Sequence, residues 1–298
     1  GQDFQTDGVV FKDTSCSFND VLFRWYIVCD AHGLHDNYVL KKIKSFDFQK
    51  AMMTNPNNVV QQLHAFIDGD DPSLSYGSGS TFSCVRIYAN KVVCEWLGDS
   101  TIVIIDKNEN VLFKSTPHNV TNPVEMERIM SIDEEFYKNI GGKRYKTSNC
   151  LHVISPQIIT MKSSYYHFIP HGKDAIADSI SISRFLGHGS AHPLMRELER
   201  YEFNYSSDHP GFTVAMGSDG VFDMICDEEL PTILYLSSEE LLNIAQKRWK
   251  QEWDQEWIDE NGILQLSKQK IYGPGDDLAL VIWRKLPVED SPTVFSCD

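Results

Sequence analysis

The stretch that decides the fold reads VLFRWYIVCDAHG at residues 21–33. Its first nine residues are rich in β-branched and aromatic side chains, which is typical of a strand. The run then ends abruptly in the polar tetrapeptide Asp-Ala-His-Gly at residues 30–33. The sequence therefore predicts a strand that delivers a carboxylate, Asp30, to the end of a sheet.

Three more aspartates lie at the ends of predicted strands. Asp99 occupies a tight Gly-Asp-Ser turn, Asp219 follows a short apolar run, and Asp276 precedes the last such run. Each alone is an ordinary turn residue. Together they predict carboxylates that converge on one cleft, where they would repel one another unless a cation neutralised them. An all-oxygen site suits Mg²⁺ or Mn²⁺ better than zinc.

The remaining pattern predicts antiparallel sheets covered by helices, in one domain that spans residues 1–298. Connections between the central strands are short enough for hairpins. Residues 188–211 lack a clear period and are expected to form a flap-like excursion. The expected elements are strands at 21–29, 81–89, 91–97, 101–106, 212–216 and 278–283, and helices at 58–67, 123–140 and 227–258.

Composition excludes several classes of protein. Hydrophobic residues make up 42% of the 298 residues, which is enough for a sizeable core, and no apolar run approaches the ~20 residues of a membrane span. The 27 basic and 42 acidic residues give a net charge of −15, which repels nucleic-acid backbones. We therefore expect neither nucleic acid nor membrane as a partner.

The seven cysteines predict thiols rather than disulfides. Their number is odd, no pair has Cys-x-x-Cys spacing, and several lie within apolar runs. Such cysteines are typical of buried, reduced side chains. The expected location is accordingly intracellular, in the reducing cytoplasm.

The residues around the strand-end acids resemble seven motifs of the metal-dependent serine/threonine protein phosphatases, type 2C. The motifs occur in the order of that family and span residues 28–283. In chain order they are VCDAHG at 28–33, GSGST at 77–81, WLGDS at 96–100, PHN at 117–119 followed by EMERI at 125–129, ISRFLG at 182–187, MGSDGVFD at 216–223 and GDDLALV at 275–281.

The resemblance implies an α+β fold, an αββα four-layer sandwich of two antiparallel sheets flanked by helices. It also implies a phosphoprotein substrate, two Mg²⁺ or Mn²⁺ ions, and a third ion at a weaker site. By the same resemblance, Asp30 would bridge two ions and the carbonyl of Ala31 would complete the shell of the first. Asp219 and Asp276 would hold the second ion.

Three further positions match the family pattern. Asp99 and Asp223, together with Asp219, correspond to the third-metal site. His32 is the candidate general acid for the departing serine or threonine oxygen.

The chain departs from the family pattern most at its N-terminus. The family has a phosphate-binding arginine there, but this chain has no arginine before Arg24, which lies roughly 20 Å from Asp30 along an extended strand. Asp13, after Lys12, is the candidate for the acid that follows that arginine. The other departures are Ala31 and Leu34 for glycines, His188 for an acid and Asp277 for asparagine.

Three tryptophans, Trp249, Trp253 and Trp257, recur every four residues within the predicted helix 227–258. Such a stripe is most often the face with which a helix packs on its own domain. The alternative is a face on which a partner docks.

The motifs favour metal-dependent hydrolysis of phosphoserine and phosphothreonine in proteins. One alternative is a catalytically weak pseudophosphatase that serves as a binding or structural module on the same fold. Another is metal-assisted hydrolysis of a different phosphoester.

Overall fold

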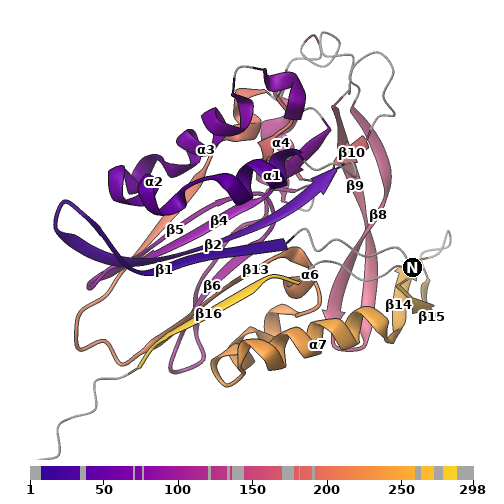
Figure 1. The fold of residues 1–298 in the computed structure, drawn as a ribbon. Coiled ribbons are helices and arrows are strands. Elements are labelled where there is room, and N and C mark those ends of the chain that lie inside the picture. Colours follow the sequence, from indigo (N-terminus) through magenta and orange to yellow (C-terminus); the bar gives the residue numbers. More distant parts are fainter. Residues whose placement is uncertain are drawn as a thin grey trace, which may run out of the picture.

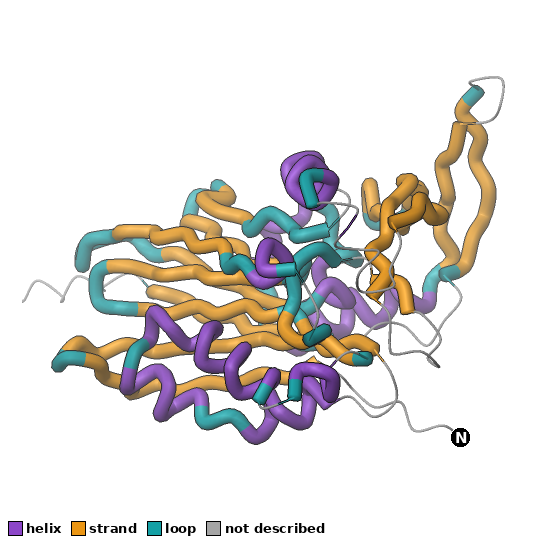
Figure 2. The backbone as a smooth tube through the Cα atoms, turned by 90° about the horizontal axis from the view of Figure 1, so that it is seen from above, coloured by secondary structure: helices purple, strands orange, loops and turns teal. Residues whose placement is uncertain are grey.

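The computed structural model shows two antiparallel sheets packed face to face, with helices on both outer faces (Figures 1 and 2). The larger sheet has the strand order β11-β3-β2-β4-β5-β12, with β1 paired to β2, and the smaller has the order β16-β13-β6-β7. The predicted α+β, αββα sandwich is confirmed. The structure describes residues 8–33, 38–69, 71–75, 77–119, 122–132, 135, 144–169, 178–180, 182–189, 192–258, 263–271 and 278–286.

The strands of the larger sheet are β1 (Gly8–Phe18), β2 (Val21–Gly33), β3 (Ser78–Ser80), β4 (Phe82–Ile87), β5 (Lys91–Leu97), β11 (Leu186–Gly187) and β12 (Glu199–Asn204). Those of the smaller sheet are β6 (Thr101–Asp106), β7 (Val111–Lys114), β13 (Phe212–Gly217) and β16 (Leu280–Lys285). The helices are α1 (Tyr38–Ser45), α2 (Phe48–Thr54), α3 (Val59–Asp68), α4 (Pro123–Met130), α6 (Asp219–Phe222) and α7 (Ser238–Lys250). Short 3₁₀ turns cover Pro56–Asn58, Pro72–Ser75, Pro193–Arg196 and Asp227–Leu234.

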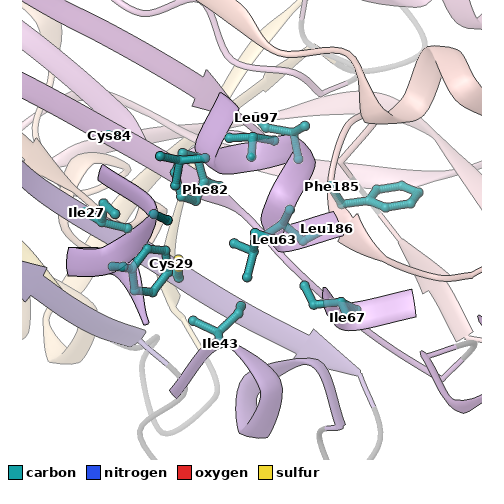
Figure 3. Close-up of a cluster of buried hydrophobic side chains, with 14 of the residues drawn as sticks. Ile27, Cys29, Ile43, Leu63, Ile67, Phe82, Cys84, Leu97, Phe185 and Leu186 are labelled. Atoms are coloured by element: carbon teal, nitrogen blue, oxygen red, sulfur yellow. The ribbon is translucent and has the colours of Figure 1, made fainter. Parts of the chain in front are cut away.

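Alternation along β2 explains why this strand is central to the sandwich. Successive side chains of a strand point to opposite faces. Ile27 and Cys29 pack in the cluster under α1–α3, whereas Tyr26 and Val28 pack between the two sheets. Figure 3 shows the cluster on the helix side, where Ile43 and Leu63 meet the sheet. Both faces of β2 are buried from Trp25 to Cys29, a part of the strand without charged residues.

The second helical layer covers the smaller sheet. Val103 and Ile105 of β6 face this layer, while Ile102 and Ile104 face the opposite sheet. The covering elements are α6, α7 and the 3₁₀ turn before α7 (Figure 1). The sandwich therefore has four layers, with one apolar cluster between each neighbouring pair. The ends of the strands lie at the rim of this sandwich.

A third sheet lies to one side of the sandwich, and the sequence did not predict it. Its order is β10-β9-β14-β15, with β8 paired to β9 (Figure 1). The strands are β8 (Arg144–Ser155), β9 (Ile158–Ile169), β10 (Asp178–Ile180), β14 (Glu252–Ile258) and β15 (Leu264–Lys270). Strand β14 joins β9 in parallel, so two segments about 95 residues apart must meet.

The predicted helix over 227–258 is wrong in its last part. Helix α7 ends at Lys250, and the chain continues as strand β14. Trp249 packs on the core under α7, and its indole Nε1 donates to the carbonyl of Gly220 at 2.7 Å. Trp253 is fully buried in the strand. The helical docking face on Trp249, Trp253 and Trp257 therefore does not form.

The expected flap at 188–211 is also wrong in part, because this segment contains a strand of the main sheet. Strand β12 pairs with β5 along its whole length and forms one edge of the sheet. Its side chains alternate between half-buried and exposed, as expected for an edge strand. Tyr201 stacks on Phe113 with ring centroids 4.1 Å apart, which ties this edge to the smaller sheet.

Five cysteines in the described part of the chain are buried and unpaired: Cys16, Cys29, Cys84, Cys94 and Cys226. Burial raises the pKa of the Cys84 thiol to about 12, so this side chain stays protonated at neutral pH. This agrees with the expectation of buried thiols; Cys150 and Cys297 are not among the side chains described. Within the ranges given above, none of the helices has the length and apolar character that crossing a bilayer requires.

Candidate metal centre

Backbone hydrogen bonds fix the end of β2, where Asp30 lies. The amide of Asp30 donates to Oγ1 of Thr81 at 3.0 Å, and the amide of Thr81 donates to the carbonyl of Asp30 at 2.8 Å. Ser80 Oγ adds a third bond to the same carbonyl at 3.1 Å. The carboxylate of Asp30 is thus presented by a strand end that these hydrogen bonds of its backbone hold in place.

Ala31 follows in the same strand, opposite Ser80. It is not among the residues with positive φ, so alanine is tolerated where the related motif has glycine. The carbonyl proposed to contact a cation is thus carried by an ordinary extended residue.

A pair of hydroxyl groups connects Asp30 to the turn that carries Asp99. Thr81 Oγ1 and Ser100 Oγ lie 2.7 Å apart, and both residues are buried. Asp99 itself is half-buried, and Nδ2 of Asn119 donates to its Oδ2 at 3.3 Å. The end of β2 and the turn between β5 and β6 are therefore joined at the same end of the sandwich.

Asp219 reaches this end from β13. Gly217, the last residue of that strand, pairs with Thr101 at the start of β6, and Asp99 lies two residues before Thr101. Oδ1 of Asp219 accepts from the amide of Gly220 at 2.8 Å, and the carboxylate is half-buried. The pairing of β6 with β13 therefore places the backbone of Asp99 and that of Asp219 at the same end of the smaller sheet.

Of the two remaining predicted ligands, Asp223 and Asp276, only Asp223 is among the described residues. Asp223 lies one helical turn after Asp219, to whose carbonyl its amide donates at 2.7 Å, and it is exposed. Asp276 lies outside the described residues. Nearby, Ser218 binds Ala279 twice, through its amide at 2.9 Å and its Oγ at 3.0 Å. The segment after Asp276 thus runs beside the start of α6.

His32 forms a close pair with His188. Their Nε2 atoms are 3.0 Å apart, and the rings stack with centroids at 5.2 Å. Burial lowers the pKa of His32 to about 4, so the ring is neutral at neutral pH. His188 stands in the position where the related motif has an acid, and its φ of 45° is left-handed. No local pattern predicts this pair, since 156 residues separate the two.

Gly79 provides the space in which these two rings meet. A Cβ on Gly79 would lie 2.5 Å from Nε2 of His32 and 2.5 Å from Nε2 of His188. We expect Gly79→Ala to force the rings apart and to lower the free energy of unfolding by about 1–3 kcal/mol, as overpacking does. Urea denaturation measures this loss, and adding His188→Ala should restore part of it. Unchanged stability in Gly79→Ala would contradict this packing.

The expectation that Asp13 supplies the acid next to the centre is wrong. Asp13 pairs with Trp25, whereas Gly8 is the residue opposite Asp30. Five residues of strand, about 17 Å, therefore separate Asp13 from the rim. Asp13 instead accepts from the amide of Ser15 at 2.9 Å within a β-bulge.

Arg24 lies in β2 six residues before Asp30, at a distance from the strand end as its spacing predicted, and its side chain is exposed. It pairs with Ile87, away from the rim. Arg24 therefore does not replace the phosphate-binding arginine that the family pattern has before this strand.

Behind the Asp99 turn lies a buried group that the sequence did not single out as a unit. Ligand atoms of His118, Glu125 and Glu199 lie within 4.8 Å of one another, a geometry that could hold a cation. The carboxylate of Glu125, however, already accepts from Arg184 and from Arg128 Nη2 at 2.8 Å. A metal would have to displace two guanidinium groups, so the contacts favour a structural ion-pair network.

The electrostatics of Glu125 support this interpretation. Burial alone would raise the pKa of Glu125, but hydrogen bonds from Arg128, Arg184 and Ser183 outweigh it and hold the pKa at about 2. Glu125 is only 1% exposed. The carboxylate is therefore ionised throughout the physiological range and acts as the hub of the network.

Comparisons with known proteins agree with the motifs and the fold. The family model Protein phosphatase 2C matches residues 26–148. A solved serine/threonine phosphatase of S. agalactiae aligns with a TM-score of 0.53 at 14% identity, over 96% of this chain and 95% of that one. A sex-determining protein of C. elegans aligns with a TM-score of 0.48 at 16% identity, over 92% and 64% of the two chains. No curated protein sequence matches. The family-model match confirms the resemblance to the type 2C family over residues 26–148, and the S. agalactiae alignment confirms the fold.

Proposed function

We propose that this chain, which has the type 2C phosphatase fold and matches that family over residues 26–148, hydrolyses phosphoserine and phosphothreonine in proteins with Mg²⁺ or Mn²⁺. The observation that carries the proposal is the placement of Asp30, Asp99 and Asp219. The three residues lie at or just after the ends of β2, β5 and β13, and the hydrogen bonds of Thr81 and Ser100 and the β6–β13 pairing support the proposal that these ends share one rim of the sandwich.

The donor set fits hard divalent cations. The side chains at the rim offer carboxylate oxygens, which Mg²⁺ and Mn²⁺ prefer. Four of the five buried thiols lie in strands of the larger sheet, and Cys226 caps a 3₁₀ turn. Asp30 and the Ala31 carbonyl would hold the first ion, and Asp30, Asp219 and Asp276 the second. Asp99, Asp219 and Asp223 would hold a third, weaker one. Such cations would neutralise phosphoryl oxygens and activate a water for attack on phosphorus.

The protein's own residues would contribute positioning and a proton donor. His32 remains the candidate general acid, because it follows the bridging acid in the same strand. Its neutral ring, bonded to His188, is a weaker proton donor than an imidazolium. We therefore expect slow turnover on poor leaving groups such as serine alkoxide, and faster turnover on p-nitrophenyl phosphate, whose leaving group needs no proton.

The proposal is tested by a metal-dependent assay. With excess Mn²⁺, the purified chain is expected to release phosphate from a phosphothreonine peptide and from p-nitrophenyl phosphate, and EDTA should stop both reactions. A phosphodiester substrate, bis(p-nitrophenyl) phosphate, separates a monoesterase from the alternative phosphoesterase. No hydrolysis of either monoester at saturating Mn²⁺ would refute the proposal.

A second candidate function is a pseudophosphatase that binds other proteins on the same fold. Two observations favour it: His32 is engaged by His188, and Arg24 lies far from the rim. This function predicts that a phosphothreonine peptide is not hydrolysed, whether or not it binds. It also predicts that Mn²⁺ does not raise the unfolding temperature of the chain. The assay above, read together with a thermal melt, distinguishes the two functions.

A further inference from the structure

The turn that carries Asp99 is held by one residue from another part of the chain. The carbonyl of Gly98 accepts from the amide of His118 at 3.0 Å, and the amide of Gly98 donates to Nδ1 of His118 at 3.1 Å. Gly98 has φ of 106°, and a Cβ there would lie 2.7 Å from the side chain of Thr81. Both backbone groups of Gly98 are thus bonded to a single histidine in a tightly packed turn.

These contacts also fix the tautomer of His118. Because Nδ1 accepts a hydrogen bond, the ring proton of the neutral imidazole lies on Nε2. Nε2 faces Oε1 of Glu199 at 3.5 Å, and the imidazole is fully buried. Burial lowers the pKa of His118, which keeps the ring neutral. The ring is further stacked on Trp96 at an interplanar angle of 14°.

Asn119, the next residue, contacts the carboxylate itself. Its Nδ2 donates to Oδ2 of Asp99 at 3.3 Å. Its backbone forms a bridge with Ile182, and the carbonyl of His118 accepts from the amide of Ser183 at 2.7 Å. The segment 118–119 is therefore anchored on one side to the chain around Ser183 and on the other to the Asp99 turn.

The anchor on the Ser183 side is the buried ion-pair network. Arg184 donates to Glu125, and also to Oε1 of Glu199 at 2.9 Å. The same Glu199 oxygen faces His118. A continuous set of contacts thus extends from Glu125 through Arg184 and Glu199 to His118 and the turn.

We infer that His118 and Asn119 are positioning residues for the Asp99 carboxylate, His118 through the backbone of the turn and Asn119 through the carboxylate oxygen. The inference rests on the proposed function, in which Asp99 helps to hold the weaker cation. A carboxylate that is already oriented loses less rotamer freedom when it binds an ion. Removing a group that orients a metal ligand typically weakens metal affinity by roughly 10–100-fold.

The test is a Mn²⁺ titration of the full chain by calorimetry, with Mn²⁺ counted by electron paramagnetic resonance. In Asn119→Ala we expect the weakest binding step to become roughly 10–100-fold weaker, while the tighter steps stay unchanged. Asn90→Ala, which removes an exposed asparagine in the β4–β5 turn, is the matched control and should titrate like the wild type. His118→Phe keeps a flat ring against Trp96 but lacks Nδ1, and should show the same selective loss.

Three outcomes would overturn the inference, and they are distinguishable. An unchanged weakest step in Asn119→Ala would show that the amide does not orient Asp99. An equal loss at every step, with a lower unfolding temperature of the metal-free variant, would show a merely structural role. A wild-type chain that takes up no Mn²⁺ would refute the metal centre of the proposed function, and with it this inference.

Discussion

Replacing Asp30 by asparagine is expected to abolish metal-dependent hydrolysis while leaving the fold intact. The substitution keeps the shape of the side chain but removes the negative charge that would bridge two cations. A metal centre contributes several kcal/mol to stabilising the transition state, and each 1.36 kcal/mol is a factor of ten in rate. We therefore expect kcat on a phosphothreonine peptide to fall by about 10³-fold or more.

The fold should survive because the strand end is held by main-chain groups. The amide and carbonyl of Asp30 form the bonds to Thr81, and the carbonyl also accepts from Ser80; all of these remain in Asp30→Asn. The matched control is Asp20→Asn at the other end of the β1–β2 hairpin. Asp20 is exposed and has φ of 64°, a conformation that asparagine adopts readily.

The measurement is kcat at saturating Mn²⁺ for the wild type and both variants, with thermal unfolding of each. Asp219→Asn should resemble Asp30→Asn, since it removes a charge from the same rim. If Asp30→Asn retained most of the wild-type rate, the carboxylate would not belong to the catalytic centre, and the proposed function would have to be abandoned.

The core of the sandwich could be predicted from the sequence because each of its strands has a recognisable local pattern of apolar residues. The strands at 91–97 and 101–106 have the predicted bounds, and each is buried on both faces. The acids at the strand ends could be predicted for the same reason. A carboxylate that follows an apolar run is a local signal, and antiparallel pairing then brings such ends together.

The third sheet could not be predicted, because its pairing joins distant segments and its pattern is ambiguous. Trp253 and Trp257 are four residues apart, a spacing that places them on one face of a helix and also on one face of a strand. Helix α7 ends at its C-cap residue, Gln251, whose amide donates to the carbonyl of Arg248. Basic residues in the last turn, including Lys247 and Arg248, are the signal that could have marked this end.

The contacts around the candidate site depend on register, which local patterns do not fix. The register of β1 on β2 sets Asp13 opposite Trp25 and Gly8 opposite Asp30, so that Asp13 lies well away from Asp30. The pair formed by His32 and His188 likewise requires β3 to lie between β2 and β11. The sequence thus pointed to the candidate ligands of the site but not to the residues that surround them.

The largest effect on stability is expected from Glu125→Gln. The amide keeps the size of the side chain but leaves Arg184 and Arg128 without the charge that both now contact. Breaking a buried ion pair by removing one partner costs about 3–5 kcal/mol. We expect the free energy of unfolding to fall by about this amount at pH 7. Glu127→Gln, an exposed residue on the same helix α4, is the matched control.

The acid dependence of the effect identifies the carboxylate as its source. The pKa of Glu125 is held at about 2 in the folded chain, against about 4.3 in an unfolded one. A group with a depressed pKa stabilises the fold above its unfolded pKa, and the contribution is lost as the pH falls from about 4.3 toward 2. The difference in stability between wild type and Glu125→Gln should therefore be full at pH 7 and smaller at pH 3.5. Urea denaturation at both pH values measures it, and a difference that stays constant would show that packing, not charge, holds the network together.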